Sequence, residues 1–199
     1  MLTDVNWKSV YRSGDDNLLE DFYKPILGNA ISYDRAVGFF SSELFSANLK
    51  GLSSLVANEG KMRLVIGHPL SELEFKAIQH GNELARTLDK LNEKLLELIT
   101  EAKSQSIDRL ELLAWLIASD RLTIKYALRR QGMYHEKIGV IKDKDGNTVV
   151  FQGSANETLY AMSDQYNAES IMVFPSWKQD VFSEYGKPCV DGFENLWEG

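Results

Sequence analysis

Two apolar, strand-like segments flank one amphipathic segment early in the chain, and this pattern limits the possible fold more than any other feature. Residues 31–40 (ISYDRAVGFF) and 61–69 (KMRLVIGHP) have the composition of buried strands. Residues 41–60 between them begin with serines and end at a glycine, as helices do. Because a strand–helix–strand unit places its two strands side by side and parallel, the pattern predicts an α/β fold.

The rest of the chain predicts further helices and strands around this unit. Residues 15–27 read as a first helix, and residues 71–119, with an amphipathic piece at 107–120, as a helical insertion that packs on the sheet or binds a partner. Alternating segments at 121–128, 133–143 and 147–153 predict strands, with a hairpin turn at Asp145-Gly146. A short helix from residue 154, a strand at 167–174 and a closing helix follow, so we expect one domain over residues 1–199.

Composition is typical of a soluble globular protein, with 44% hydrophobic and 26% charged residues. No apolar run reaches the roughly 18 residues of a membrane span, and the N-terminus lacks the pattern of a signal peptide, so we expect a cytoplasmic protein. The single cysteine, Cys189, fits a reducing compartment. No cysteine–histidine cluster has zinc-ligand spacing, and we expect neither a metal nor a cofactor.

Charge is unevenly distributed along the chain. The formal net charge is −7, which argues against non-specific coating of nucleic acid. Residues 121–142, however, carry six basic side chains against one acidic side chain. This basic segment includes His135, a candidate residue for the functional site.

A histidine and a lysine lie two residues apart in the predicted strand 133–143, and a Gly-Ser-Ala-Asn turn follows the hairpin. The spacing of His135 and Lys137 directs both side chains to one face of a strand. The turn at 153–156 brings a hydroxyl, an amide and the expected N-terminus of a helix, which together can bind an anion. Imidazole can attack phosphorus or donate a proton, while lysine, serine and asparagine stabilise the developing charge.

This stretch resembles the HKD signature of the phospholipase D superfamily, HxKxxxxD followed by GSxN. His135, Lys137 and the residues from Gly153 to Asn156 match, whereas Lys142 occupies the usual aspartate position and Asp143 comes one residue later. The resemblance implies catalytic roles for His135, Lys137, Ser154 and Asn156, and supporting roles for Gly153 and Asp143. It also implies that Glu169, on the following strand, orients the imidazole of His135.

Each of these residues also has a structural interpretation. His135 can be a structural histidine, Ser154 and Asn156 can be ordinary helix caps, and Glu169 can be a solvated carboxylate. Residues 31–69 resemble phospholipase D-like domains that precede helicase-type motors or occur in restriction-type nucleases. Arg35 and Ser41 lie in or next to the first predicted strand, and for each a substrate contact and a structural role are equally expected. The basic side chains of Lys125, Arg129 and Arg130 are expected to bind a polyanionic substrate.

The resemblance implies a phospholipase D-like α-β-α sandwich with a mixed central sheet and a metal-independent phosphodiesterase that forms a phosphohistidine. The family mechanism uses two HKD motifs and this chain has one, so we expect a homodimer that completes the site. The leading function is that of a DNA endonuclease in a restriction or phage-defence context. Because similar domains often precede a helicase, this chain can be the N-terminal fragment of a longer protein. The alternatives are a non-catalytic nucleic-acid-binding or dimerisation module of a helicase, and a hydrolase of phospholipids or small phosphodiesters.

Overall fold

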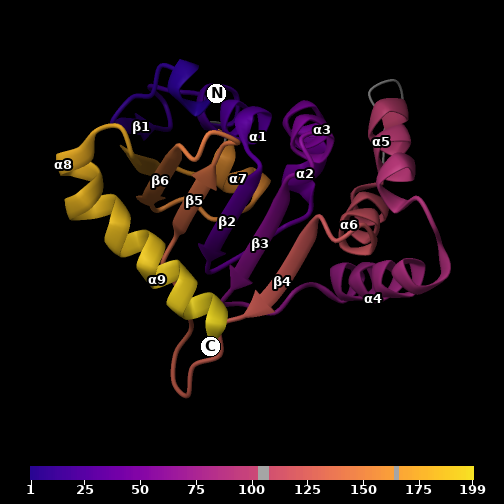
Figure 1. Cartoon of the computed structure of the whole chain (residues 1–199). Helices are drawn as coiled ribbons and strands as arrows, with labels where there is room; N and C mark the ends of the chain where they lie inside the picture. Colours follow the sequence, from indigo (N-terminus) through magenta and orange to yellow (C-terminus); the bar gives the residue numbers. More distant parts are fainter. Residues whose placement is uncertain (103–107, 164–165) are drawn as a thin grey trace.

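A mixed sheet forms the centre of the computed structural model, which describes residues 1–102, 108–163 and 166–199 (Figure 1). Within these residues the sheet has seven strands in the order β1 (Val10–Arg12), β7 (Ser170–Pro175), β6 (Thr148–Gly153), β5 (Ile138–Lys142), β2 (Ser32–Val37), β3 (Lys61–Ile66) and β4 (Leu122–Tyr126). Strands β2, β3 and β4 are parallel, and the other neighbouring pairs are antiparallel. The predicted mixed sheet is confirmed, while β1 was not predicted.

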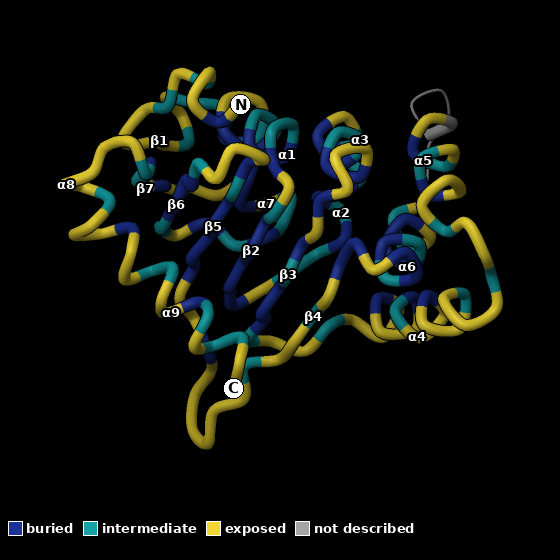
Figure 2. Tube along the Cα trace, viewed as in Figure 1, coloured by how far each residue is buried: buried dark blue, intermediate teal, exposed yellow. Residues whose placement is uncertain are grey.

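Helices cover both faces of the sheet. The larger core lies on one face, where Tyr33 and Val37 of β2 pack with residues of α1 (Lys24–Asn29) and α3 (Leu49–Ala57). The intervening Ala36 points to the other face and packs in a second cluster with Phe193 of α9 (Lys187–Glu198). This alternation follows from the period of two along a strand. Figures 1 and 2 show α9 crossing one face and the central strands buried, which confirms the predicted α-β-α sandwich.

The predicted strand–helix–strand unit is present, with its helix divided in two. Strands β2 and β3 pair in parallel from Ser32↔Lys61 to Val37↔Ile66. Helix α2 (Glu43–Ala47) ends at Asn48, and the side chain of Asn48 accepts a hydrogen bond of 3.2 Å from the backbone N–H of Gly51. That bond caps the start of α3, so the break comes from a polar residue that competes for the backbone.

The helical insertion consists of α4 (Glu72–Thr87), α5 (Leu91–Ala102) and α6 (Arg109–Ala118), which lie beside the β4 edge of the sheet (Figure 1). Ser71 and Glu74 form a capping box at the start of α4, and the buried Glu74 also accepts a 2.8 Å bond from the backbone N–H of Ser42. The part of the predicted insertion at 103–107 lies outside the described residues. Along the described chain, no helix has both the length and the apolar composition to cross a bilayer.

Short helical elements complete the described chain. They are a 3-10 turn (Leu2–Asp4), a π-helical turn (Leu18–Tyr23) that runs into α1, α7 (Leu159–Met162), α8 (Gln179–Val181) and a second π-helical turn (Phe182–Gly186) that runs into α9. The first predicted helix at 15–27 corresponds to the π-helical turn and α1. The predicted closing helix corresponds to α8, the second π-helical turn and α9.

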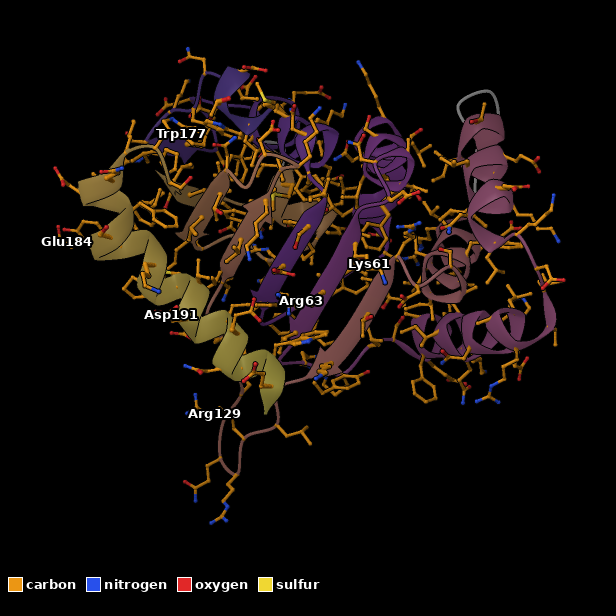
Figure 3. The ribbon with its side chains drawn as sticks, in the orientation of Figure 1. Lys61, Arg63, Arg129, Trp177, Glu184 and Asp191 are labelled. Carbon is orange, nitrogen blue, oxygen red and sulfur yellow. The ribbon has the colours of Figure 1, made fainter. Side chains whose placement is uncertain are left out.

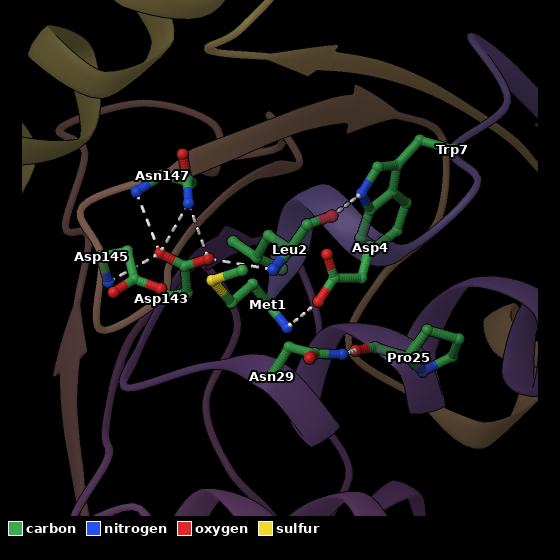
Figure 4. A network of polar contacts seen from close by, with 9 residues as sticks. All are labelled: Met1, Leu2, Asp4, Trp7, Pro25, Asn29, Asp143, Asp145 and Asn147. Carbon is green, nitrogen blue, oxygen red and sulfur yellow. Dashed lines mark hydrogen bonds and ion pairs between the residues drawn. The ribbon is translucent and has the colours of Figure 1, made fainter.

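Asp143 ties the β5–β6 hairpin to the N-terminus (Figure 4). Its buried carboxylate accepts bonds from the backbone N–H of Leu2 (2.9 Å), Asp145 (3.0 Å) and Asn147 (3.0 Å). Gly146 has a φ of +81°, as predicted for the turn. Burial favours the neutral form of Asp143, but the hydrogen bonds from Asn147, Leu2 and Asp145 outweigh it and lower the pKa of this carboxyl. Asp143 thus lies at the far end of β5 from His135 and supports the fold.

We expect Asp143→Ala to lower the free energy of unfolding by about 2–4 kcal/mol, because buried N–H donors lose a charged acceptor. Since the pKa is depressed in the folded state, this contribution is present above the unfolded value of about 3.9 and is lost as the pH falls through the folded pKa. Urea unfolding of the wild type and the variant at pH 7 and at lower pH measures the difference, which should shrink with acid. Asp145→Ala, in the exposed part of the same turn, is the control; an equal loss in both variants would contradict the assignment.

Candidate active site

The residues of the predicted motif, apart from Asp143, meet at one end of the sheet. Strands β2, β3 and β6 end there, and β5 and β7 begin there, as the pairs Ala36↔Ile138, Ile138↔Gln152 and Gly153↔Ile171 show. The chain enters this end at His135, returns at Ser154 and passes it again at Glu169. Sheet topology therefore brings together three segments that are separated in sequence.

His135 and Lys137 lie in direct contact. The Nζ atom of Lys137 is 3.0 Å from Nδ1 of His135 and donates a 2.6 Å bond to the His135 carbonyl. Both residues precede β5 in an extended loop, so the prediction that they lie in the strand is wrong. The ladder with β2 stops at Ala36↔Ile138, two positions before the chain of β2 reaches Gly38. A Cβ at Gly38 would lie 3.1 Å from Cδ2 of His135, so a glycine lets the loop pass close to the imidazole.

Lys137 is a nearly buried cation. Burial is the main cause that lowers the pKa of its ammonium, and the positive charge of Arg35 acts in the same direction. The carboxylate of Glu169 opposes both effects. A lysine whose charge is poorly compensated has much to gain from an anion placed beside it.

Ser154 and Glu169 contact each other. The hydroxyl of Ser154 donates to Glu169 Oε2 and accepts a 3.0 Å bond from the backbone N–H of Ser170. The other Glu169 oxygen accepts a 3.2 Å bond from Asn167. The expected hydrogen bond between Glu169 and His135 is not formed among the described residues, and the carboxylate instead accepts from Ser154 and Asn167. Gly153 is required in this turn, since a Cβ there would lie 2.0 Å from the Ser170 carbonyl oxygen.

The side chain of Asn156 is held by the loop after β2. Its Oδ1 accepts a 3.0 Å hydrogen bond from the backbone N–H of Phe39. This bond assigns the oxygen, rather than the nitrogen, of the amide to the side that faces the loop after β2. No described residue accepts a hydrogen bond from its Nδ2. A Cβ at Gly38 would lie 3.4 Å from Asn156 Oδ1 and 3.1 Å from the His135 ring, so the two side chains are neighbours across this glycine.

The Gly-Ser-Ala-Asn turn does not begin a helix, and this part of the prediction is wrong. Helix α7 begins at Leu159, with the side chain of Thr158 as its cap. Between the turn and the helix, Glu157 enters the core with 0% exposure and holds the chain in an extended bridge to Phe40. Anion binding at this end of the sheet therefore depends on side-chain donors rather than on a helix N-terminus.

A buried polar cluster lies under the turn, and sequence reasoning missed it. Glu157 accepts bonds from Tyr23 (2.6 Å), Tyr33 (2.9 Å) and Nε of Arg35 (3.0 Å). Arg35 also donates to the Ala155 carbonyl and lies 4.7 Å above the ring of Phe151. The available signal was the alternation of Tyr33 and Arg35 on one face of β2, together with a glutamate directly after the turn.

The remaining predicted residues lie around this centre or away from it. Arg35 is 1% exposed, so the expectation of a substrate contact is corrected to a role beneath the turn. The backbone N–H of Ser41 donates to the Glu157 carbonyl (2.9 Å), and its hydroxyl accepts from the N–H of Glu43 (3.4 Å). Lys125 donates to the Trp197 carbonyl (2.6 Å) and lies 4.4 Å from the Trp197 ring centroid, so α9 engages it.

Arg129 and Arg130 lie in the loop that leads from β4 to His135. Both are exposed, and neither forms an ion pair with any residue that the structure describes. Figure 3 shows the side chain of Arg129 extending from the end of the sheet into solvent. Over the same described ranges, no three His, Cys, Asp or Glu side chains are grouped to hold a metal ion.

Comparisons with solved structures identify the fold. NucT from Helicobacter pylori, a phospholipase D superfamily member, is 14% identical, with 96% of this chain and 94% of NucT covered and a TM-score of 0.53. Phosphatidylserine synthase from Haemophilus influenzae Rd KW20 is 13% identical over 94% of this chain and 37% of its own, with a TM-score of 0.49. Yeast tyrosyl-DNA phosphodiesterase is 10% identical, with 83% of this chain and 31% of the yeast protein covered and a TM-score of 0.44.

This chain thus spans about a third of the latter two structures and nearly the whole of NucT. No protein-family model and no curated protein matches the sequence. The fold of the chain is phospholipase D-like, as its sequence motif predicted.

The buried cluster yields a prediction for stability. Arg35→Met or Glu157→Leu alone leaves one buried charge without its partner, and each should lower the free energy of unfolding by about 3–5 kcal/mol. The double variant should lose clearly less than the sum, because it leaves neither charge behind. A double-mutant cycle from urea unfolding measures the coupling, and strictly additive losses would contradict the ion pair as the support of the turn.

Proposed function

We propose that this chain is a phosphodiesterase that cleaves DNA, with His135 as the nucleophile and two copies of the chain at each active site. The observation that carries the proposal is the meeting of His135, Lys137 and Asn156 at one end of a phospholipase D-like sheet. An imidazole contacts a poorly compensated ammonium, and the amide of Asn156 lies next to the same imidazole across Gly38. Such a set can hold a phosphate and attack it.

In the first chemical step, Nε2 of His135 forms a bond to phosphorus, and the bond from phosphorus to the leaving oxygen breaks. The second copy's His135 donates a proton to that oxygen. In the second step, water gives its proton to the second copy's imidazole and its oxygen attacks phosphorus. The phosphorus–nitrogen bond then breaks and regenerates His135.

Lys137 and Asn156 bind the phosphate in this scheme. Before substrate enters, the Lys137 ammonium contacts Nδ1 of His135, so a neutral ring carries its proton on Nε2. A phosphate competes for the ammonium, which frees Nδ1 to take the proton and leaves the lone pair of Nε2 for attack. The same anion compensates the nearly buried charge of Lys137 and accepts a bond from Asn156 Nδ2.

DNA is the proposed substrate because of the charge beside the site. The loop from β4 to His135 carries the exposed guanidinium groups of Arg129 and Arg130 in a chain of net charge −7. Backbone phosphates attract such groups irrespective of sequence.

The proposed second imidazole comes from another copy of the chain. His80 lies on α4 in the helical insertion, and His68 stacks on Phe39 and contacts Pro69, without a lysine beside it. A two-fold axis near His135 would place two copies of the same residues around one phosphate.

We expect His135→Asn to abolish cleavage of DNA while leaving DNA binding within a few-fold of the wild type, because the variant loses the nucleophile and keeps the phosphate donors. Cleavage by the wild type should persist in EDTA. Gel assays of labelled DNA measure cleavage, and fluorescence anisotropy measures binding. His80→Asn on α4 is the control, and it should cleave normally.

Three results would contradict this prediction. Cleavage that stops in EDTA would exclude the histidine mechanism. A wild type that binds DNA without cleaving it would favour a non-catalytic binding module. Hydrolysis of phospholipid vesicles without any cleavage of DNA would indicate a lipid substrate.

The shared site makes a quantitative prediction for mixed copies. If wild type is unfolded and refolded with increasing His135→Asn at constant total protein, random pairing leaves two active imidazoles in a fraction equal to the square of the wild-type fraction. Activity should therefore fall with that square. A linear fall, or a monomer by light scattering at full activity, would show that one copy is sufficient.

A further inference from the structure

Phe39 and His68 form an exposed aromatic pair beside the candidate active site. Their ring centroids are 4.6 Å apart at an interplanar angle of 29°. The residues follow the ends of the neighbouring parallel strands β2 and β3. We call these two side chains the aromatic platform.

The platform is held in place although it is exposed. Nδ1 of His68 donates a 3.0 Å bond to the Pro69 carbonyl, which fixes the orientation of the imidazole. Phe39 is 38% exposed, whereas the next residue, Phe40, packs against Phe45 with centroids 5.5 Å apart. The core therefore uses one of the two adjacent phenylalanines and leaves the other at the surface.

The platform connects directly to the catalytic side chains. The backbone N–H of Phe39 donates the 3.0 Å bond that orients Asn156, and the preceding Gly38 packs against the ring of His135. Met133, which is 37% exposed, approaches Gly38 from the loop before His135, with Cε 3.6 Å from the position of a Cβ there. A group that rests on Phe39 is thus a near neighbour of a phosphate held by Asn156.

We propose that the aromatic platform binds an unstacked base next to the scissile phosphate, so that the chain prefers single-stranded nucleic acid. Every base offers a π-face to an aromatic ring, whereas a duplex keeps those faces stacked on one another. The exposed arginines of the loop before His135 supply the attraction for the backbone. This proposal rests on the proposed phosphodiesterase function and adds the substrate class.

The test compares Phe39→Leu with Phe39→Trp. Leucine keeps the backbone N–H for Asn156 and a similar apolar volume but has no π-face, whereas tryptophan keeps one. Trp177→Leu is the matched control, because Trp177 is also 38% exposed but follows the opposite end of β7 (Figure 3). Each variant is assayed on a labelled single-stranded oligodeoxynucleotide and on an oligomer of abasic tetrahydrofuran phosphates, which has the same backbone without bases.

We expect Phe39→Leu to raise KM for the single strand about 5- to 100-fold, with a much smaller change for the abasic oligomer. Phe39→Trp and Trp177→Leu should stay close to the wild type on both. Equal effects of Phe39→Leu on both oligomers, or no effect on either, would overturn the platform while leaving the phosphodiesterase intact.

Further outcomes separate the platform from the function on which it rests. If the wild type cleaves neither these oligomers nor duplex DNA, the phosphodiesterase proposal fails and anisotropy still tests the platform; cleavage of the duplex alone would overturn the platform and leave the phosphodiesterase intact. Weaker binding of the single strand by Phe39→Leu, with unchanged binding of the abasic oligomer, supports the platform. Hydrolysis of phosphatidylglycerol vesicles that Phe39→Leu impairs, without loss of single-strand binding, would assign the aromatic platform to lipid and overturn the proposal.

Discussion

The carboxylate of Glu157 is fully buried beneath the Gly-Ser-Ala-Asn turn, and the geometry of the site depends on how this charge is compensated. A buried carboxylate needs both an opposite charge and hydrogen-bond donors. Arg35 supplies the charge, and the hydroxyls of Tyr23 and Tyr33 supply the other donors. Because Arg35 also donates a hydrogen bond to the Ala155 carbonyl, it joins β2 to the turn that carries Ser154 and Asn156. Those residues are held without a helix to support them.

Above this support, the side chains from three segments of the chain lie at one end of the sheet. Lys137 contacts the imidazole of His135, Ser154 contacts Glu169, and Asn156 is oriented by the backbone of Phe39. The Lys137 ammonium and the Asn156 amide remain as donors for the proposed phosphate, whereas the Ser154 hydroxyl already donates its proton to Glu169. Exchange of the Lys137 ammonium from Nδ1 to a phosphate oxygen would couple binding of the substrate to the protonation state of the nucleophile.

Sequence reasoning predicted the parts of this arrangement that depend on local pattern. The strands around residues 31–69 and the turn at Gly146 follow from periodicity and turn chemistry. Motif spacing predicted a shared face for His135 and Lys137, but placed them wrongly inside the strand. Contacts between distant segments were not predictable in this way. Arg35 was expected at the substrate because nothing in its own segment shows that Glu157, more than a hundred residues later, pairs with it. The same buried pair explains why a helix expected at residue 154 begins only at Leu159.

Attack of His135 on phosphorus would leave a covalent intermediate, and trapping that intermediate tests the proposed nucleophile most directly. The wild type is mixed with a DNA substrate that carries a single radioactive phosphate, quenched in alkali during turnover, and digested for mass spectrometry, because phosphohistidine survives base. If His135 is the nucleophile, label is expected on the peptide that contains His135, at a stoichiometry below one per dimer, and none in His135→Asn. Cleavage with no labelled protein at any time point, or label on another residue, would contradict it.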